Sequence, residues 1–305
     1  MKQVRTYSPN VRVGNWLEDI VLKEDMLKEF LEQKDRGELT LQRIGTLRDN
    51  ILKPVELSVA RGSVRFGDTV MLLNAVASGP GPDSHQDLHC LSIIADIKPQ
   101  TRPQPDNNQS LPAPCYVSAA KSLQPCVRNA FTIDSVDGTV KGEELRYGQS
   151  FYLRTTAGYA GELYLASDAK SFQKCARKSR LQEVSLVEEP SFLCHWTVKL
   201  LDPKRRQEQC GTPVPANTKV LISHCKTNQC LALLSNHVLW TPYGKEYEVT
   251  AHTLLDSHKA EQPGNHWLMA TADPGNPGDT LVQSQQSANG DTEEDCGAKP
   301  APENI

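Results

Sequence analysis

Three stretches of the chain carry the same short motifs in the same order, and this repetition limits the possible folds more than any other feature. Each stretch has a turn motif followed by an apolar run, then a segment of the form L-x-x-x-S, and then a strand that begins with an aromatic residue. Self-similarity of this kind indicates an architecture built from one supersecondary unit. The turn motifs are Arg65-Phe66-Gly67-Asp68, Arg146-Tyr147-Gly148-Gln149 and Pro215-Ala216-Asn217-Thr218, the L-x-x-x-S segments are Leu88–Ser92, Leu163–Ser167 and Leu231–Ser235, and the aromatic residues are Phe131, Trp196 and Trp267.

The region 55–273 is predicted to be an all-β domain. Its short apolar-alternating runs are separated by Gly, Asp, Asn and Pro, which favours a sandwich or a barrel over an α/β fold. Three units of about four strands each predict a β-trefoil-like domain, with another β-sandwich or barrel as the alternative. In either fold we expect Phe131, Trp196 and Trp267 to lie in the core.

The N-terminal part of the chain has a different pattern. Residues 1–21 are punctuated by Pro and Gly and predict an extended arm. Residues 22–36 predict an amphipathic helix, with Gly37 as a C-terminal cap. The apolar face of this helix either docks on the body or binds a partner. That face is made of Met26, Leu27, Phe30 and Leu31.

Two segments have the composition of solvated chain. Residues 98–114 are rich in proline and predict a flexible insertion, and residues 274–305 predict a disordered acidic tail. Seven acidic residues and one lysine follow residue 270, in a chain whose net charge is −4. The net charge argues against a nucleic-acid partner, because nucleic-acid binders usually carry a basic excess. The body that precedes the tail is close to neutral, which suits packing against several partners and selects none of them.

The sequence also bears on the compartment. No apolar run approaches the ~18 residues of a membrane span, and the first residues lack the apolar region of a secretory signal. The nine cysteines form no C-x-x-C pair, so we expect reduced thiols that are mostly buried. These features predict a cytosolic or cytoskeletal protein that does not contact a membrane.

Three groups of residues have the types found in metal or catalytic sites, and none has the required spacing. His224, Cys225, Cys230 and His237 lack the tight pairs of a zinc site, and the Asp134–Glu144 segment places its glycine too early for a calcium loop. Asp256-Ser257-His258 cannot form a hydrolase triad by adjacency. We therefore expect no metal, no cofactor and no enzymatic activity. Arg177–Arg180 and Lys204–Arg206 are basic clusters that are either solvated or meet an acidic protein surface.

Several segments resemble one known family. Residues 11–16, with Glu18 and Asp19, are similar to the start of the cilia- and flagella-associated protein 161 family. The helix that follows, the Arg146–Gln149 turn, and the segments 244–258 and 265–267 are similar to it as well. The resemblance covers roughly residues 9–272 and fades over 76–114 and in the acidic tail.

The resemblance implies a microtubule inner protein. Such a protein lies in the A-tubule lumen of ciliary doublet microtubules, contacts α/β-tubulin and other luminal proteins, and stabilises the axoneme of the beating cilium or flagellum. It is a structural component of the cytoplasmic cytoskeleton and has no catalytic residues. Arg12 and Trp16 are the candidate contact residues, because Arg and Trp are frequent anchors of interfaces; Trp16 packing on the body is the alternative.

A second function is compatible with the repeats. A trefoil-type module that binds a ligand or carbohydrate in the cytosol would need an exposed aromatic residue, with Asn, Asp or Gln beside it, at equivalent places in the three units. Phe131, Trp196 and Trp267 meet this requirement only if they are exposed.

Overall fold

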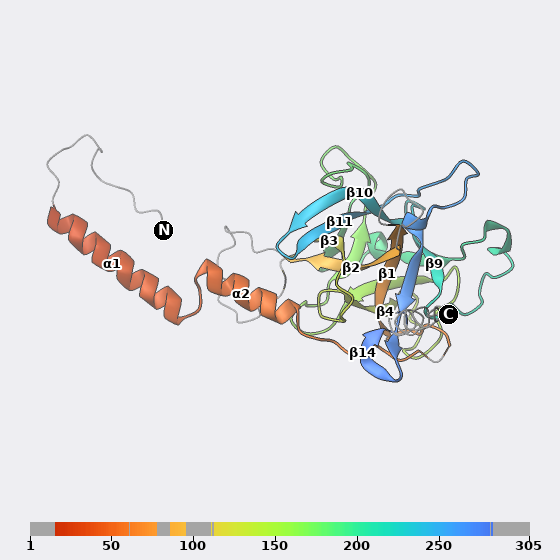
Figure 1. Cartoon of the computed structure of the whole chain (residues 1–305), viewed down its shortest axis with the longest axis horizontal. Coiled ribbons are helices and arrows are strands. Elements are labelled where there is room, and N and C mark those ends of the chain that lie inside the picture. The colour runs from red at the N-terminus through yellow and green to blue at the C-terminus, as the bar shows by residue number, and fades with distance from the viewer. Residues whose placement is uncertain are drawn as a thin grey trace, which may run out of the picture. The chain divides into compact units, whose positions relative to one another are not determined.

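The computed structural model describes residues 16–60, 62–77, 86–95, 111, 113–280 and 282. The chain divides into two compact units (Figure 1). One unit is formed by residues 1–49 and 97–105, and the other by residues 50–96 and 106–305.

Helix α1 (Trp16–Asp35) and helix α2 (Thr40–Ile51) begin the described chain. The helix predicted at 22–36 is confirmed, but it starts at Trp16, so residues 16–21 are helical and do not belong to an extended arm. Ile20 and Val21 continue the apolar spacing, and the acidic side chains of Glu18 and Asp19 suit the positive end of the helix dipole. The remainder of the predicted arm, residues 1–15, lies outside the described residues.

Gly37 ends α1 as predicted. Its φ is +72°, and the main-chain nitrogen of Glu38 donates to the oxygen of Gln33 at 2.9 Å, which is a Schellman-type cap. Helix α2 was not predicted, because Gly45 interrupts its pattern. Its signal is the helical spacing of Ile44, Leu47 and Ile51.

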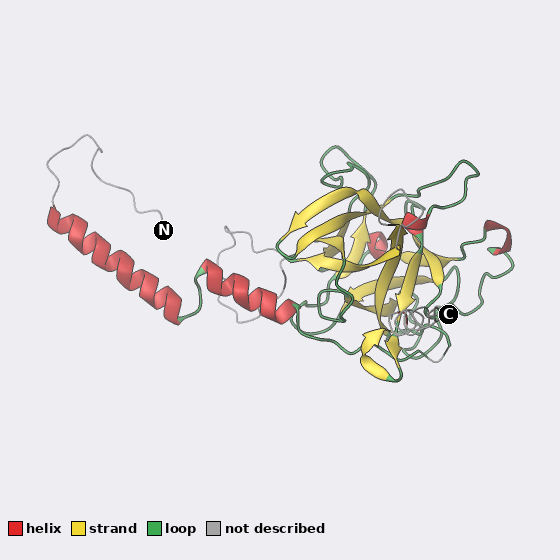
Figure 2. Ribbon diagram, in the orientation of Figure 1, coloured by secondary structure: helices red, strands yellow, loops and turns green. Residues whose placement is uncertain are grey.

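The second unit is built from strands (Figure 2). The prediction of an all-β domain is confirmed. In chain order the strands are β1 (Thr69–Ala77), β2 (Gln86–Ile94), β3 (Cys115–Ala120), β4 (Ala130–Ser135), β5 (Ser150–Thr155), β6 (Tyr164–Ser167), β7 (Val184–Val187), β8 (Trp196–Lys199), β9 (Lys219–His224), β10 (Leu231–Thr241), β11 (Gly244–Ala251), β12 (Trp267–Ala270), β13 (Ala272–Asp273) and β14 (Asn276–Thr280), with short 3-10 turns at Phe192–Cys194, Pro203–Arg205 and Pro263–Asn265.

The pairings of these strands close on themselves. The antiparallel path β1–β2–β3–β7–β6–β5–β8–β9–β12 returns to β1 and forms a nine-stranded barrel. Strand β4 pairs with both β1 and β5, which gives a shorter circuit through β1, β4, β5, β8, β9 and β12. The hairpin β10–β11 joins the assembly through β11 and β3. Closure leaves few strand edges open to solvent.

Each of the three repeated turns contains one residue in the left-handed region. These residues are Gly67, Gly148 and Asn217, whose φ values are +91°, +84° and +56°. Glycine adopts this conformation without steric cost, and asparagine is among the side chains that tolerate it. The third turn therefore keeps the backbone of the other two although its sequence differs.

The three turns also make the same long-range hydrogen bond. The main-chain nitrogen of the left-handed residue donates to a carbonyl in an aromatic-led strand, with distances of 2.7, 3.1 and 3.1 Å. The acceptor is in every case the second residue after the leading aromatic residue, so the turn and the strand keep one register in all three units. The donor–acceptor pairs are Gly67–Ile133, Gly148–Val198 and Asn217–Met269.

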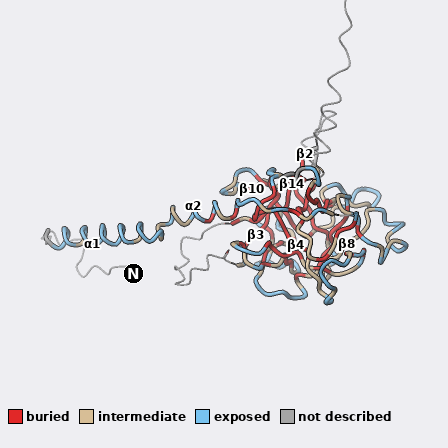
Figure 3. The backbone as a smooth tube through the Cα atoms, turned by 90° about the horizontal axis from the view of Figure 1, so that it is seen from below, coloured by how far each residue is buried: buried red, intermediate tan, exposed pale blue. Residues whose placement is uncertain are grey.

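The three leading aromatic residues lie in the core, as predicted. Phe131, Trp196 and Trp267 are each 0% exposed. The indole nitrogen of Trp196 donates to the oxygen of Leu165 at 2.7 Å, and that of Trp267 donates to the oxygen of Leu231 at 2.9 Å. Buried residues concentrate along the strands (Figure 3). The aromatic positions thus serve packing in this protein.

These two indole bonds correct one detail of the repeat alignment. Leu231 receives the bond from Trp267, and the residue that receives the bond from Trp196 is Leu165 and not Leu163. The L-x-x-x-S match of the second unit is therefore displaced by two residues. A displacement by two keeps a strand residue on the same face, so the apolar pattern alone did not reveal it.

The predicted tail is shorter than expected. Strand β14 pairs with β13 at residues that were assigned to the disordered segment 274–305, because Pro274-Gly275 form a turn in which the nitrogen of Gly275 donates to the Asp273 carboxylate at 2.8 Å. Val282 packs against core residues. Residues 283–305 and most of the predicted insertion at 98–114 lie outside the described residues, while Leu111 is buried.

Candidate partner-binding helix

Helix α1 exposes a large apolar surface. Ile20, Val21, Met26, Leu27, Phe30 and Leu31 have exposed fractions between 39% and 59%, and no described side chain of this helix is buried. Figure 3 shows exposed and intermediate colours along the part of the helix whose side chains are described. Most helical stability in proteins comes from packing an apolar face rather than from intrinsic propensity. The exposed face is therefore the part of the described chain most in need of a partner.

Some apolar and acidic residues of α1 occupy opposite sides of the helix. Ile20, Leu27 and Leu31 recur at spacings of seven and four residues, which places them above one another on one face, with Phe30 beside them. Glu18, Asp25, Glu29 and Glu32 fall on the opposite side by the same geometry. The helix thus presents an apolar stripe in which Glu24 is the one acidic residue, and a row of carboxylates with Leu22 on the opposite side. Burying one of the large apolar side chains is worth about 1.5–3 kcal/mol.

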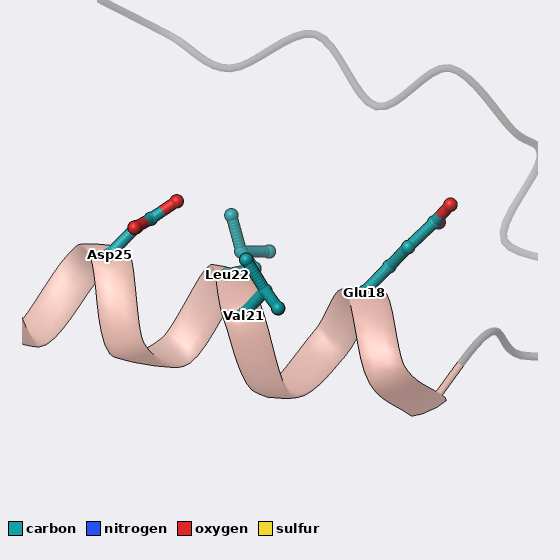
Figure 4. A pocket seen from close by; sticks show the side chains of 4 residues that line it. All are labelled: Glu18, Val21, Leu22 and Asp25. Carbon is teal, nitrogen blue, oxygen red and sulfur yellow. The ribbon is translucent and has the colours of Figure 1, made fainter.

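A shallow depression lies along α1 near its start. Its lining residues are Glu18, Val21, Leu22 and Asp25. Figure 4 shows Glu18, Leu22 and Asp25 projecting from the same side of the helix, with the two carboxylates at the ends. An apolar group flanked by cations fits it best.

The two residues singled out from the sequence are placed differently from the prediction. Trp16 is the first residue of α1 and not part of an extended arm. Arg12 lies outside the described residues. Sequence reasoning missed the exposed apolar residues of α2, Leu41 and Ile44, because that helix was not recognised.

Of the histidines near the predicted cysteine cluster, His224 and His195 have protein partners, whereas the buried Nδ1 atom of His237 has no hydrogen-bond partner among the described residues. The ring nitrogens of His224 lie 2.9 Å from the Thr227 hydroxyl and 2.9 Å from the Leu193 carbonyl, and burial lowers the pKa of this imidazole. His195 lies 3.1 Å from the Tyr152 hydroxyl. In the described part of the chain, no three His, Cys, Asp or Glu side chains gather as a metal site requires.

Two carboxylates that resembled calcium ligands or a member of a catalytic triad instead stabilise turns. Asp137 accepts hydrogen bonds from Ser135, Thr139 and Gln149, and the Thr139 hydroxyl, the largest cause, holds the pKa of this carboxyl well below its usual range. Asp256 accepts from the main-chain nitrogens of His258 and Ala260 at 2.8 and 2.9 Å. Both groups have local structural partners.

No helix among the described residues combines the length and the apolar character that crossing a bilayer requires.

The chain matches a family model described as the cilia- and flagella-associated protein 161-like domain over residues 43–272. It is 58% identical to the protein named cilia- and flagella-associated protein 161 from Danio rerio, over 98% of this chain and 99% of that one. The protein of the same name from Bos taurus is 42% identical, over 88% of this chain and 83% of its own. Among solved structures, an SDF2-like protein from Arabidopsis thaliana aligns over 68% of this chain and 93% of that one, with 14% identity and a TM-score of 0.45, too low to support an argument.

Proposed function

The chain belongs to the cilia- and flagella-associated protein 161 family, and from this premise we propose that it is a non-enzymatic structural protein of motile cilia and flagella. In this proposal it is a microtubule inner protein, held in the A-tubule lumen of the doublet by contacts with α/β-tubulin and neighbouring luminal proteins. Its role is to stabilise the axoneme during beating.

The observation that carries the proposal is the exposed apolar face of α1. A protein fixed on a polymer needs surfaces that become buried only when it is in place. The stripe of Ile20, Leu27, Phe30 and Leu31 is such a surface. A helix of this kind binds by laying its apolar face into a groove of its partner.

The body is proposed to be a β-trefoil. Three observations support it: the shorter circuit of strands through β4, the hairpins β2–β3, β6–β7 and β10–β11 outside that circuit, and the left-handed turn residue that recurs in each unit. In a trefoil, six strands close a barrel and three hairpins cover one end. Such a rigid scaffold would present its own loops without rearrangement.

The alternative function, a cytosolic module that binds a ligand or carbohydrate, loses its main candidates. It required exposed aromatic residues at equivalent places in the repeats, and Phe131, Trp196 and Trp267 are all buried. In the described part of the chain, the exposed Trp240 and Phe172 do not occupy the repeated strand position.

Fractionation of motile cilia tests the proposal. The protein should remain with doublet microtubules after detergent removes the membrane and matrix and after high salt removes the outer dyneins. A density map of the doublet should place it inside the A-tubule. Release with the soluble membrane and matrix fraction would contradict the proposal.

A further inference from the structure

The connection between β6 and β7 carries a dense group of cations. Residues 168–180 contain five basic residues and one acidic residue, Asp168. Lys174 lies 3.4 Å from the Asp168 carboxylate. In the described part of the chain, the other four form no ion pair within 4 Å, and all four are exposed. They are Lys170, Arg177, Lys178 and Arg180.

The basic connection carries a large exposed apolar side chain and lies beside the face of the β10–β11 hairpin that holds Leu239, whereas Trp240, the next residue in the strand, points to the opposite face. Phe172, within the basic connection, is 99% exposed, and Trp240, near the end of the β10–β11 hairpin, is 81% exposed. Leu239, the neighbour of Trp240, lines one depression together with Arg177 and Tyr116. The basic connection and the hairpin are therefore adjacent, although about sixty residues separate them in the chain.

The backbone beneath these cations is held in place. The buried carboxylate of Glu248 accepts hydrogen bonds from the main-chain nitrogens of Lys178 and Ser179, both at 2.8 Å. Ala176 is buried, and the Arg177 guanidinium lies 4.5 Å from the centre of the Tyr116 ring. An anchored backbone lowers the entropy lost when side chains bind, so this surface is organised before it meets a partner.

We infer that this face, formed by Lys170, Phe172, Arg177, Lys178 and Arg180, binds an acidic surface of a protein partner that offers an apolar recess for Phe172. The unpaired cations supply the charge complementarity, and Arg is among the side chains that most often anchor interfaces. The inference rests on the proposed structural role and adds to it a second contact, separate from α1.

A protein partner fits this face better than a nucleic acid. Proteins that bind single strands use a charged groove that follows the backbone, with aromatic side chains on which successive bases stack. Here the free cations belong to one connection, and Arg177 is stacked on Tyr116 rather than left open for a base. The body as a whole also lacks a basic excess.

The test compares full-length variants in binding to salt-washed doublet microtubules. Arg177→Glu combined with Lys178→Glu should weaken binding at least about tenfold and flatten its dependence on salt. Phe172→Ala should weaken binding while the salt dependence stays steep. The matched control is Lys204→Glu with Arg205→Glu, two exposed cations on the β8–β9 connection, which Figure 1 draws away from the β10–β11 hairpin. It should bind as the unmodified chain does.

Each result decides between the two proposals. Equal binding of the Arg177/Lys178 variant and the unmodified chain, with unchanged melting temperatures, overturns the inference. If the unmodified chain does not bind doublets, the proposed function fails, and polyglutamate then serves as the probe of the face. Loss of polyglutamate binding in the same variant supports the inference. If the unmodified chain binds a single-stranded oligonucleotide more tightly than a polyglutamate of equal charge, the inference of an acidic protein partner is overturned.

Discussion

The guanidinium of Arg128 lies 2.6 Å from the carboxylate of Glu246, and both side chains are buried. The second carboxylate oxygen of Glu246 accepts from the Ser118 hydroxyl at 2.6 Å, and the Nε atom of Arg128 donates to the oxygen of Ile93 at 2.8 Å. The pair therefore connects β2, β3 and β11, and it ties the β10–β11 hairpin to the barrel.

Removing one partner should destabilise the body. We expect Glu246→Ala to lower the free energy of unfolding by about 3–5 kcal/mol, because it leaves the charge of Arg128 buried and unpaired. Glu246→Gln keeps an acceptor for Ser118 and should cost less. Urea unfolding measures both, with the exposed Glu188→Ala as the control. A loss below about 1 kcal/mol for Glu246→Ala would show that the pair is not desolvated.

The left-handed turns make a second prediction. A Cβ at position 148 would lie 3.2 Å from the sulfur of Cys210, at a φ of +84°. Gly148→Ala should therefore lower stability by about 1–2 kcal/mol. Gly45→Ala is the matched change in α2, where nothing lies within 4 Å, and it should raise helix stability by about 0.5–1 kcal/mol. If the two substitutions change the melting temperature equally, the left-handed conformation at Gly148 is not what the turn requires.

Stability should fall in mild acid because of His224. Burial lowers the pKa of its imidazole in the folded state, so between the unfolded value of 6.5 and the folded value the unfolded chain binds more protons. The free energy of unfolding should accordingly decrease as the pH drops below about 6.5. His224→Gln should reduce this dependence in urea titrations, and the part that remains comes from His89, His195 and His266, whose pKa values burial also lowers. The same change at the exposed His258 is the control.

Helix α1 should be required for attachment and not for folding of the body. Leu27→Glu with Phe30→Glu places two carboxylates on the apolar stripe, which should reduce binding to doublet microtubules about tenfold or more. Glu29→Gln with Glu32→Gln alters the opposite side and serves as the control. The unfolding transition of the body should not change in either variant. Undiminished binding of the Leu27/Phe30 variant would exclude α1 as the contact.

Tryptophan fluorescence should separate the core from the exposed face. In a Trp16→Phe background the remaining indoles are Trp196 and Trp267, both 0% exposed, and Trp240, which is 81% exposed. Acrylamide should quench only the fluorescence of Trp240, and the Trp240→Phe substitution should remove this quenchable fluorescence. Strong quenching that persists in the Trp240→Phe chain would mean that the repeat aromatics are accessible, and would restore the ligand-binding alternative.

Much of the body was predictable because local chemistry determines it. The all-β pattern, the burial of Phe131, Trp196 and Trp267, and the cap at Gly37 follow from side-chain periodicity and from the conformational freedom of glycine. Helix α2 and the start of α1 were misjudged where glycine or a polar residue interrupts an otherwise helical pattern. Strand β14 was missed because a segment rich in Gly, Pro and Asp resembles disordered chain until it meets its partner β13.

Of the two candidate surfaces, one could be predicted from the sequence and the other could not. The apolar face of α1 was visible in the sequence, since helical spacing alone places its residues together. The proximity of Arg177 to Leu239 was not, because it depends on which hairpins become neighbours when the barrel closes. The chain by itself thus determined the strands, the core aromatics and the family. Only the tertiary structure decided which cations stay unpaired and which tryptophan faces solvent, because charge pairing and exposure are set by contacts between segments far apart in the chain.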